Sequence, residues 1–330
     1  MERTDGTADK VKILGRKIFF VNPSSKISNH VLLDLRDNEY EAYCIDDFRH
    51  VKYALQNFDD SICFVCVDSG LSYTTWYKFI KSVEFDAKFH GVLIGVLSER
   101  MPQSKKDFFL LNTNLPCGFT MTNMPFKDIF KRIQKVLDIN EAKGKRKFIR
   151  LLLSMNKRIN AFAEIKGRVF SLEMLDISSV GFAVNVSASV ASSFVPKQVL
   201  KSVSITLDKT TFTVQCVVLM SKVSGKVCNS VLYFLNPPDK FVQAVKAFIF
   251  EELDKSLEKL LSASSLDRTD YESLDLDSLG TYGEISEDEE LEEIAEAEEI
   301  EEIEEIEEAT EVDFSKIIVE ADEEGEDENG

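Results

Sequence analysis

The sequence lacks any apolar run of about 18 residues, the length that a membrane-spanning helix needs. Residues 1–6 also lack the charged and then apolar order of a secretion signal, so we expect a cytoplasmic protein. The six cysteines are scattered along the chain, which is typical of reduced thiols packed in a core. These absences argue against an integral membrane protein and against a secreted protein held by disulfides.

Residue patterns that carry catalysis are also scarce. The three histidines, His30, His50 and His90, all precede residue 91, and no nucleophile–histidine–acid set or metal set can be assembled from the sequence. The GxxxxGK[ST] phosphate-binding loop is absent as well. We therefore expect no enzymatic activity, no metal site and no cofactor.

Charge divides the chain into two unequal parts. Residues 267–330 hold 30 acidic side chains and two basic ones, a net charge of -28, whereas residues 1–266 carry a net charge of +9. The overall net charge of -19 therefore describes neither part. We expect a mildly basic globular body followed by a strongly acidic tail.

Short apolar runs alternate with amphipathic stretches between residues 16 and 139. The runs are rich in β-formers, as in strands buried on both faces, and the stretches between them repeat apolar residues at spacings of three and four. This alternation predicts an α/β domain with a doubly wound parallel sheet. The expected strands are 17–21, 41–45, 62–67, 92–97 and 118–121, and the expected helices are 48–57, 74–83 and 126–137.

The element order resembles a response-regulator receiver domain. Asp68 follows the third expected strand, where receivers keep the phosphoacceptor, and Ser98 ends the fourth, where they keep Ser or Thr. Residues 22–23 are Asn-Pro where receivers hold Mg²⁺ with an acidic pair, and residues 124–125 are Met-Pro where they have Lys-Pro. Without those groups a cation loses oxygen ligands and an acyl phosphate loses its counter-charge. The resemblance therefore implies a degenerate receiver-like domain in which Asp68 caps a strand end.

A basic linker at 140–150 precedes a region of different texture. Over 151–262, runs of alternating apolar and polar residues are separated by turn signals such as Lys166-Gly167, which predicts antiparallel hairpins. Six strands and a helix over 240–261 favour a small antiparallel β-barrel capped by a C-terminal helix. The expected strands are 161–165, 168–175, 182–186, 199–207, 212–220 and 227–234.

Two short motifs lie in the linker and in the region that follows it. Arg146 and Arg150 form an RxxxR, and Asp176, Ser178 and Gly181 form a DxSxxG that begins 26 positions later. Alone, the first is typical of a solvated linker and the second of a hairpin turn. In this order, ahead of barrel strands and a terminal helix, the pair resembles the PilZ domain, whose members bind cyclic di-GMP.

The PilZ-like resemblance covers residues 144–258 and departs from the common pattern at Val180, where many members have a second Gly that tolerates a left-handed backbone. The ligand's two phosphates and its guanine O6 and N7 acceptors suit the planar fork of Arg. A carboxylate can accept from a guanine N–H edge, a hydroxyl can donate to phosphate or base, and a Gly permits close backbone approach. The expected ligand-binding residues are Arg146, Arg150, Asp176, Ser178 and Gly181.

Residues 263–330 are expected to form a disordered, acidic, low-complexity tail. From Leu291 to Val312, apolar residues recur every three positions between acidic residues, so they would spiral around a helix without forming one stripe. Repulsion between the carboxylates opposes compaction. Two interpretations stay open, namely solvated disorder with transient helix, or docking on a basic surface such as a partner or residues 143–150.

The sequence thus predicts a non-catalytic cyclic di-GMP effector in a bacterial cytosol, preceded by a flexible N-terminus at 1–15. Ligand binding would order the linker, change the domain arrangement and alter the interaction with an unidentified protein partner. The alternatives are a phosphorylation-driven response regulator and a PilZ-like adaptor that does not bind nucleotide. Nucleic acid is disfavoured as a partner, because the chain has one basic cluster and no aromatic RNA-binding motif.

Overall fold

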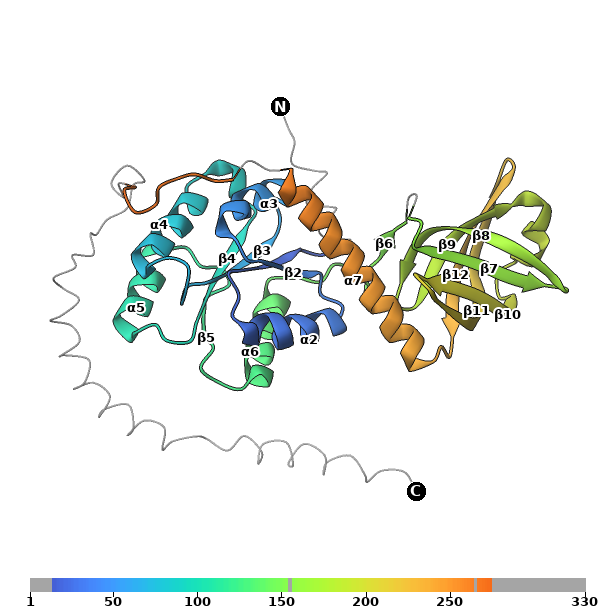
Figure 1. Cartoon of the computed structure of the whole chain (residues 1–330), viewed down its shortest axis with the longest axis horizontal. Coiled ribbons are helices and arrows are strands. Elements are labelled where there is room, and N and C mark those ends of the chain that lie inside the picture. The colour runs from blue at the N-terminus through green and yellow to red at the C-terminus, as the bar shows by residue number, and fades with distance from the viewer. Residues whose placement is uncertain (1–13, 154–155, 264–265, 275–330) are drawn as a thin grey trace, which may run out of the picture.

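The computed structural model describes residues 14–153, 156–263 and 266–274, which form an α/β unit, a β-barrel and a long helix between them (Figure 1). The expectations for residues 1–13 and for the tail from residue 275 onward lie outside the described residues. Within the described part, no helix is both long enough and apolar enough to cross a membrane.

The first unit is built on a parallel sheet, as predicted. Its five strands lie in the order β2-β1-β3-β4-β5. After β1 the chain forms β2 on one side and then crosses to form β3, β4 and β5 on the other side, which makes the sheet doubly wound. The side chains of β1, β3 and β4, which form the middle of the sheet, are almost wholly buried on both faces. The strands are β1 (Ile18–Val21), β2 (Ala42–Ile45), β3 (Ile62–Cys66), β4 (Leu93–Ser98) and β5 (Phe119–Met121).

Helices cover both faces of this sheet. One face packs against η1 (Ile27–Val31), α2 (Leu32–Asp37) and α6 (Phe126–Ile139). The other packs against η2 (Phe48–His50), α3 (Val51–Asn57), α4 (Tyr73–Glu84), η3 (Ala87–Phe89) and α5 (Gln103–Asn112). Sequence analysis missed α2 and α5. The sequence of α5 shows no apolar stripe facing the core, because the helix buries only Phe109 and leaves Leu111 84% exposed.

The second unit is an antiparallel barrel, also as predicted. Six strands pair in the order β8-β7-β10-β11-β12-β9, and β9 pairs with β8 again to close the ring. The short β6 (Leu151–Leu152) adds to β8 at the entrance of the chain. The ring strands are β7 (Ile159–Ile165), β8 (Arg168–Ser178), β9 (Gly181–Ser187), β10 (Val199–Leu207), β11 (Thr210–Ser224) and β12 (Val227–Leu235), with η4 (Ala188–Ser193) after β9.

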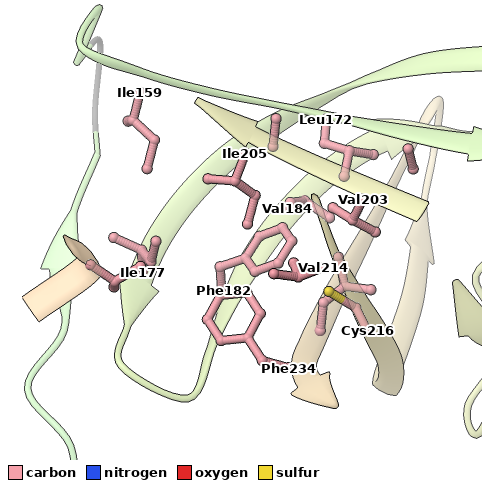
Figure 2. Packing of buried hydrophobic residues seen from close by; sticks show 14 of the residues in the cluster. Ile159, Leu172, Ile177, Phe182, Val184, Val203, Ile205, Val214, Cys216 and Phe234 are labelled. Atoms are coloured by element: carbon pink, nitrogen blue, oxygen red, sulfur yellow. The ribbon is translucent and has the colours of Figure 1, made fainter. Parts of the chain in front are cut away.

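The barrel interior is filled by alternate residues of these strands. Figure 2 shows Phe182 and Phe234 together with aliphatic side chains such as Val203 and Ile205, and the two rings stack with centroids 5.5 Å apart. In β7 the residues alternate between buried and exposed along almost the whole strand. This period of two is what the sequence signalled, because successive side chains of a strand point to opposite faces.

The helix α7 (Asp239–Ser262) belongs to both units. Its first half packs Phe241 and Val245 into the barrel core, and its second half packs Leu257 into the core of the α/β unit. Leu253 contacts both cores, and in Figure 1 the helix runs from the barrel to the α/β unit. The expectation of a helix that caps the barrel alone is therefore incomplete.

Residues 266–274 pack against the α/β unit, although sequence analysis assigned them to the acidic tail. The Tyr271 side chain is only 3% exposed and lies edge-on to Phe79, with ring centroids 5.4 Å apart. The Lys52 ammonium lies 5.2 Å from the Tyr271 ring centroid, and the amide of Asp267 donates to the carbonyl of Arg49 at 3.0 Å. One aromatic residue with a nearby basic partner thus anchors a segment that composition alone describes as tail.

Candidate functional site

A cavity of about 460 Å³ lies where the α/β unit, the basic linker and the barrel meet. This volume falls within the range of about 300 to 1,000 Å³ that is usual for small-ligand sites. Its charged lining comprises five basic residues, Arg16, Lys17, Lys143, Arg146 and Arg150, and three acidic residues, Glu39, Glu41 and Asp176. Formal charge at the cavity wall is therefore positive, as an anionic ligand requires.

Three of the five predicted site residues line this cavity. Arg146 and Arg150 come from the linker. Asp176 comes from β8, which pairs with β6, the short strand directly after the linker. The Arg150 Nη1 atom lies 3.8 Å from Asp176 Oδ2, which is an ion pair without a hydrogen bond. The Arg150 side chain is 43% exposed, so apart from this ion pair its N–H groups are accessible at the cavity wall.

The Asp176 carboxylate is held by the barrel itself. Its Oδ1 atom accepts from the backbone amide of Ala183 at 3.2 Å, across the β8–β9 pairing, where the register shifts between Met174 and Asp176. The Oδ2 atom faces Arg150. A β-bulge of this kind redirects a side chain at a strand end, so the strand pairing aims this carboxylate at the linker.

Ser178 and Gly181 are not among the residues that line the cavity, and their contact with a ligand stays a prediction. Ser178 is 5% exposed, and its hydroxyl donates to the Gly181 carbonyl at 3.0 Å within the tight β8–β9 turn. Gly181 lacks a side chain for a packing reason, since a β-carbon there would lie 2.3 Å from the Leu232 carbonyl oxygen of β12. These two residues shape the turn that presents Asp176.

The substitution of Val180 for a second Gly has no backbone cost. Neither Ser179 nor Val180 has a positive φ, so this turn does not need a residue that favours the left-handed region. The hydroxyl of Ser179 points away from the barrel and donates to Glu39 Oε1 at 2.8 Å. Ser179 therefore connects the β8–β9 turn to the α/β unit.

Sequence analysis missed the contribution of the α/β unit to the cavity. Glu39 accepts a hydrogen bond from the Ile149 amide at 3.0 Å as well as the one from Ser179. Tyr40 lies beside it, with the Lys143 ammonium 4.2 Å from its ring centroid. Burial raises the pKa of Tyr40 above its ordinary value, and its hydrogen bond to Asp138 adds to the effect. No local pattern marks these residues, because they lie about a hundred positions or more from the motifs they meet.

Asp68 lies at a different part of the α/β unit, after β3, and does not line the cavity. The Asp68 carboxylate accepts from the Ser98 hydroxyl and from the Glu99 amide, both at 2.5 Å, and from the Tyr73 hydroxyl at 3.4 Å. The Asn22 side chain donates to the Ser69 carbonyl at 2.6 Å. Across the described residues, no group of three or more His, Cys, Asp or Glu side chains is placed to hold a metal ion. Asp68 therefore caps the turn after β4.

No family model and no curated protein sequence matches the chain. Among solved structures, it is similar to the MrkH–c-di-GMP complex of K. pneumonia, with 16% identity over 36% of this chain and 57% of that one and a TM-score of 0.33. It is also similar to Escherichia coli YcgR in complex with c-di-GMP, with 11% identity over 37% and 52% and a TM-score of 0.31. The inhibitor of motility MotI/DgrA of Bacillus subtilis has 16% identity over 35% and 52% and a TM-score of 0.29. The chain spans about half the length of these proteins, and likeness at this level does not assign it to a family.

Proposed function

We propose that the protein is a non-catalytic effector that binds cyclic di-GMP in the cavity at the domain junction. One observation carries the proposal, namely that two arginines of one short motif and the aspartate of another line the same positively charged cavity, although they are 26 or more positions apart. Neither motif is informative alone, but a ligand with two phosphates and two guanines needs guanidinium groups and a carboxylate in one place.

Each of the three side chains has a distinct role in this proposal. Arg150 and Arg146 offer planar pairs of N–H donors to phosphate oxygens or to guanine O6 and N7. Asp176 accepts from the N–H edge of a guanine, and its bond to the Ala183 amide keeps it in position. Ser178 and Gly181 act indirectly, because they build the turn that carries Asp176.

The output of binding is a changed relation between the two units. The linker that carries both arginines also joins the units, so a ligand that draws the arginines together orders the segment that sets their spacing. The altered surface is then read by a protein partner in the cytoplasm. This conversion of a nucleotide signal into an interaction requires no chemical step at the site.

Isothermal titration with cyclic di-GMP tests the proposal. Arg146→Ala and Arg150→Ala should each weaken binding by about tenfold to a hundredfold, because hydrogen bonds to charged groups contribute roughly 1.5 to 3 kcal/mol. Arg168→Ala is the matched control, since Arg168 is an exposed arginine at the start of β8 that does not line the cavity. Cyclic di-AMP serves as the control ligand, because adenine lacks the O6 acceptor. Wild-type protein that gives no heat with cyclic di-GMP at high micromolar concentration would contradict the proposed function.

A further inference from the structure

One carboxylate of the α/β unit touches both motifs of the proposed site. Glu39 Oε2 accepts from the amide of Ile149, which lies inside RxxxR, at 3.0 Å, and Glu39 Oε1 accepts from the hydroxyl of Ser179, which lies inside DxSxxG, at 2.8 Å. The side chain is 13% exposed, so these contacts are made largely away from water. Each motif is therefore tied to the same point of the neighbouring unit.

The negative charge of Glu39 is compensated by α7. The Lys246 ammonium lies 3.3 Å from Glu39 Oε1 and donates to the carbonyl of Asp37 at 2.7 Å, at the end of α2. A partly buried ion pair of this kind keeps the carboxylate in place, and it offsets the repulsion that the carboxylate alone would exert on an anionic ligand. Glu39 thereby joins four segments, which are α2, the linker, the β8–β9 turn and α7.

The backbone at Glu39 is also unusual for its residue type. Its φ is 62°, in the left-handed region, where it ends α2 with its amide donating to the Arg36 carbonyl at 3.0 Å. Gly or Asn is usual at such a position, because a larger side chain with a β-carbon is disfavoured there. A glutamate persists at this strained position while its carboxylate makes contacts that Gly could not make.

We propose that Glu39 is a positioning residue of the ligand site, through which the α/β unit holds the RxxxR linker and the DxSxxG turn in their binding arrangement. This proposal rests on the proposed function for its ligand, but the positioning itself is a property of the ligand-free protein. It assigns the first unit a direct part in forming the site, beyond its role as a neighbour of the barrel.

The sign of a mutational effect separates positioning from simple electrostatics. Removing a carboxylate from the wall of a cavity that takes an anion should tighten binding if charge alone matters. Removing Glu39 should instead weaken binding if its hydrogen bonds hold the two motifs. Glu41 provides the comparison, because it lines the same cavity while its carboxylate bonds to Lys17 and Tyr43 within the α/β unit.

Titration with cyclic di-GMP should show Glu39→Ala binding about tenfold more weakly than wild type, because two hydrogen bonds that order the site are lost. Glu39→Gln should recover part of the affinity, since its amide oxygen can accept from the Ile149 amide and its amide nitrogen can donate to Ser179. The recovery is incomplete because this nitrogen replaces the Oε1 atom that pairs with the Lys246 ammonium. Glu41→Gln should bind as tightly as wild type or more tightly. Equal or tighter binding by Glu39→Ala, or an equal loss in Glu39→Gln, would overturn the proposal.

Hydrogen exchange in the ligand-free protein gives a readout that does not depend on binding. The amide of Ile149 should exchange faster in Glu39→Ala than in wild type or Glu41→Gln, while the amides of the barrel core keep their protection. Unchanged exchange at Ile149 would show that Glu39 does not position the linker. If wild type fails to bind cyclic di-GMP, the proposed function fails, and the exchange rate at Ile149 still decides whether Glu39 positions the linker.

Discussion

At the scale of single residues, the two motifs divide into side chains that face the cavity and side chains that shape the backbone. Arg150 and Asp176 face each other at 3.8 Å, whereas Ser178 bonds to Gly181 inside a turn. Gly181 is required by the carbonyl of Leu232, because a β-carbon has no room there. A short motif therefore combines side chains that face the cavity with residues that shape the backbone, and the sequence of the motif does not show which residue has which role.

In the α/β unit, the sequence position of Asp68 likewise does not define its role. Its position at the end of the third strand matches a phosphoacceptor, yet the structure satisfies its oxygens with Ser98 and the amide of Glu99. We predict that acetyl phosphate with Mg²⁺ will not phosphorylate it, because Asn22 and Pro23 supply no carboxylate for a cation that prefers several oxygen ligands.

Intact-mass measurement after incubation with acetyl phosphate decides between this prediction and the response-regulator alternative. Neither wild type nor Asp68→Asn should gain the mass of a phosphate. A stoichiometric gain of one phosphate in wild type, absent from Asp68→Asn, would support phosphorylation and contradict the interpretation of Asp68 as a cap.

At the scale of elements, α7 holds the two units together, and the segment after it packs on the α/β unit. Arg36 of α2 makes two bonds to Asp254 of α7, at 2.5 and 2.9 Å, and its guanidinium lies 4.8 Å from the ring centroid of Phe250. The chain then continues to Tyr271, which packs on the α/β unit. The helix expected to cap the barrel thus also stabilises the α/β unit.

Tyr271→Ala should lower the free energy of unfolding of the α/β unit by about 2 to 4 kcal/mol, because a buried aromatic ring leaves a cavity that the surroundings fill only in part. The ring contacts of Phe48 and Phe79 would be lost together. Urea denaturation followed by tryptophan fluorescence measures this, since Trp76 lies 5.6 Å from Phe79 in the same cluster.

Tyr233→Ala is the control for this substitution, because Tyr233 is 42% exposed on the barrel. We expect it to change the free energy of unfolding by less than about 1 kcal/mol. Equal stability of Tyr271→Ala and wild type would mean that residues 266–274 contribute nothing to the unit on which they pack.

At the scale of the whole molecule, attraction between oppositely charged parts of the chain is the main long-range interaction. Residues 275–330 carry 27 acidic side chains and one basic side chain, whereas the cavity wall is positive. A tethered acidic segment has a high effective concentration near its own chain, so it should compete with an anionic dinucleotide for the linker arginines.

Truncation after Leu274 should therefore tighten cyclic di-GMP binding at low ionic strength and change it little at physiological salt. Screening shortens the Debye length from about 30 Å at 0.01 M to about 8 Å at 0.15 M. The cut follows Leu274 so that the packed Tyr271 segment is retained. Paired titrations at both salt concentrations measure the effect, and identical affinities for the two proteins at low salt would show that the tail does not act on this site.

The sequence by itself determined the two fold classes and the residues on which the function is proposed. Period-two alternation predicted the barrel strands, and alternating strand and helix patterns predicted the parallel sheet. The resemblance of the two motifs to the PilZ domain implied that Arg146, Arg150 and Asp176 act together, and these three residues line one cavity. These signals are local, because each depends on which faces of one element are buried or on residues within one short motif.

Only the tertiary structure decided where the units meet and what joins them. The bonds from Glu39 to Ile149 and Ser179, the shared helix α7 and the packing of Tyr271 all connect segments separated by a hundred positions or more. No periodicity within a segment encodes such a contact. It depends on the path of the whole chain, which places a helix end of one unit against a turn of the other and gives the cavity its walls.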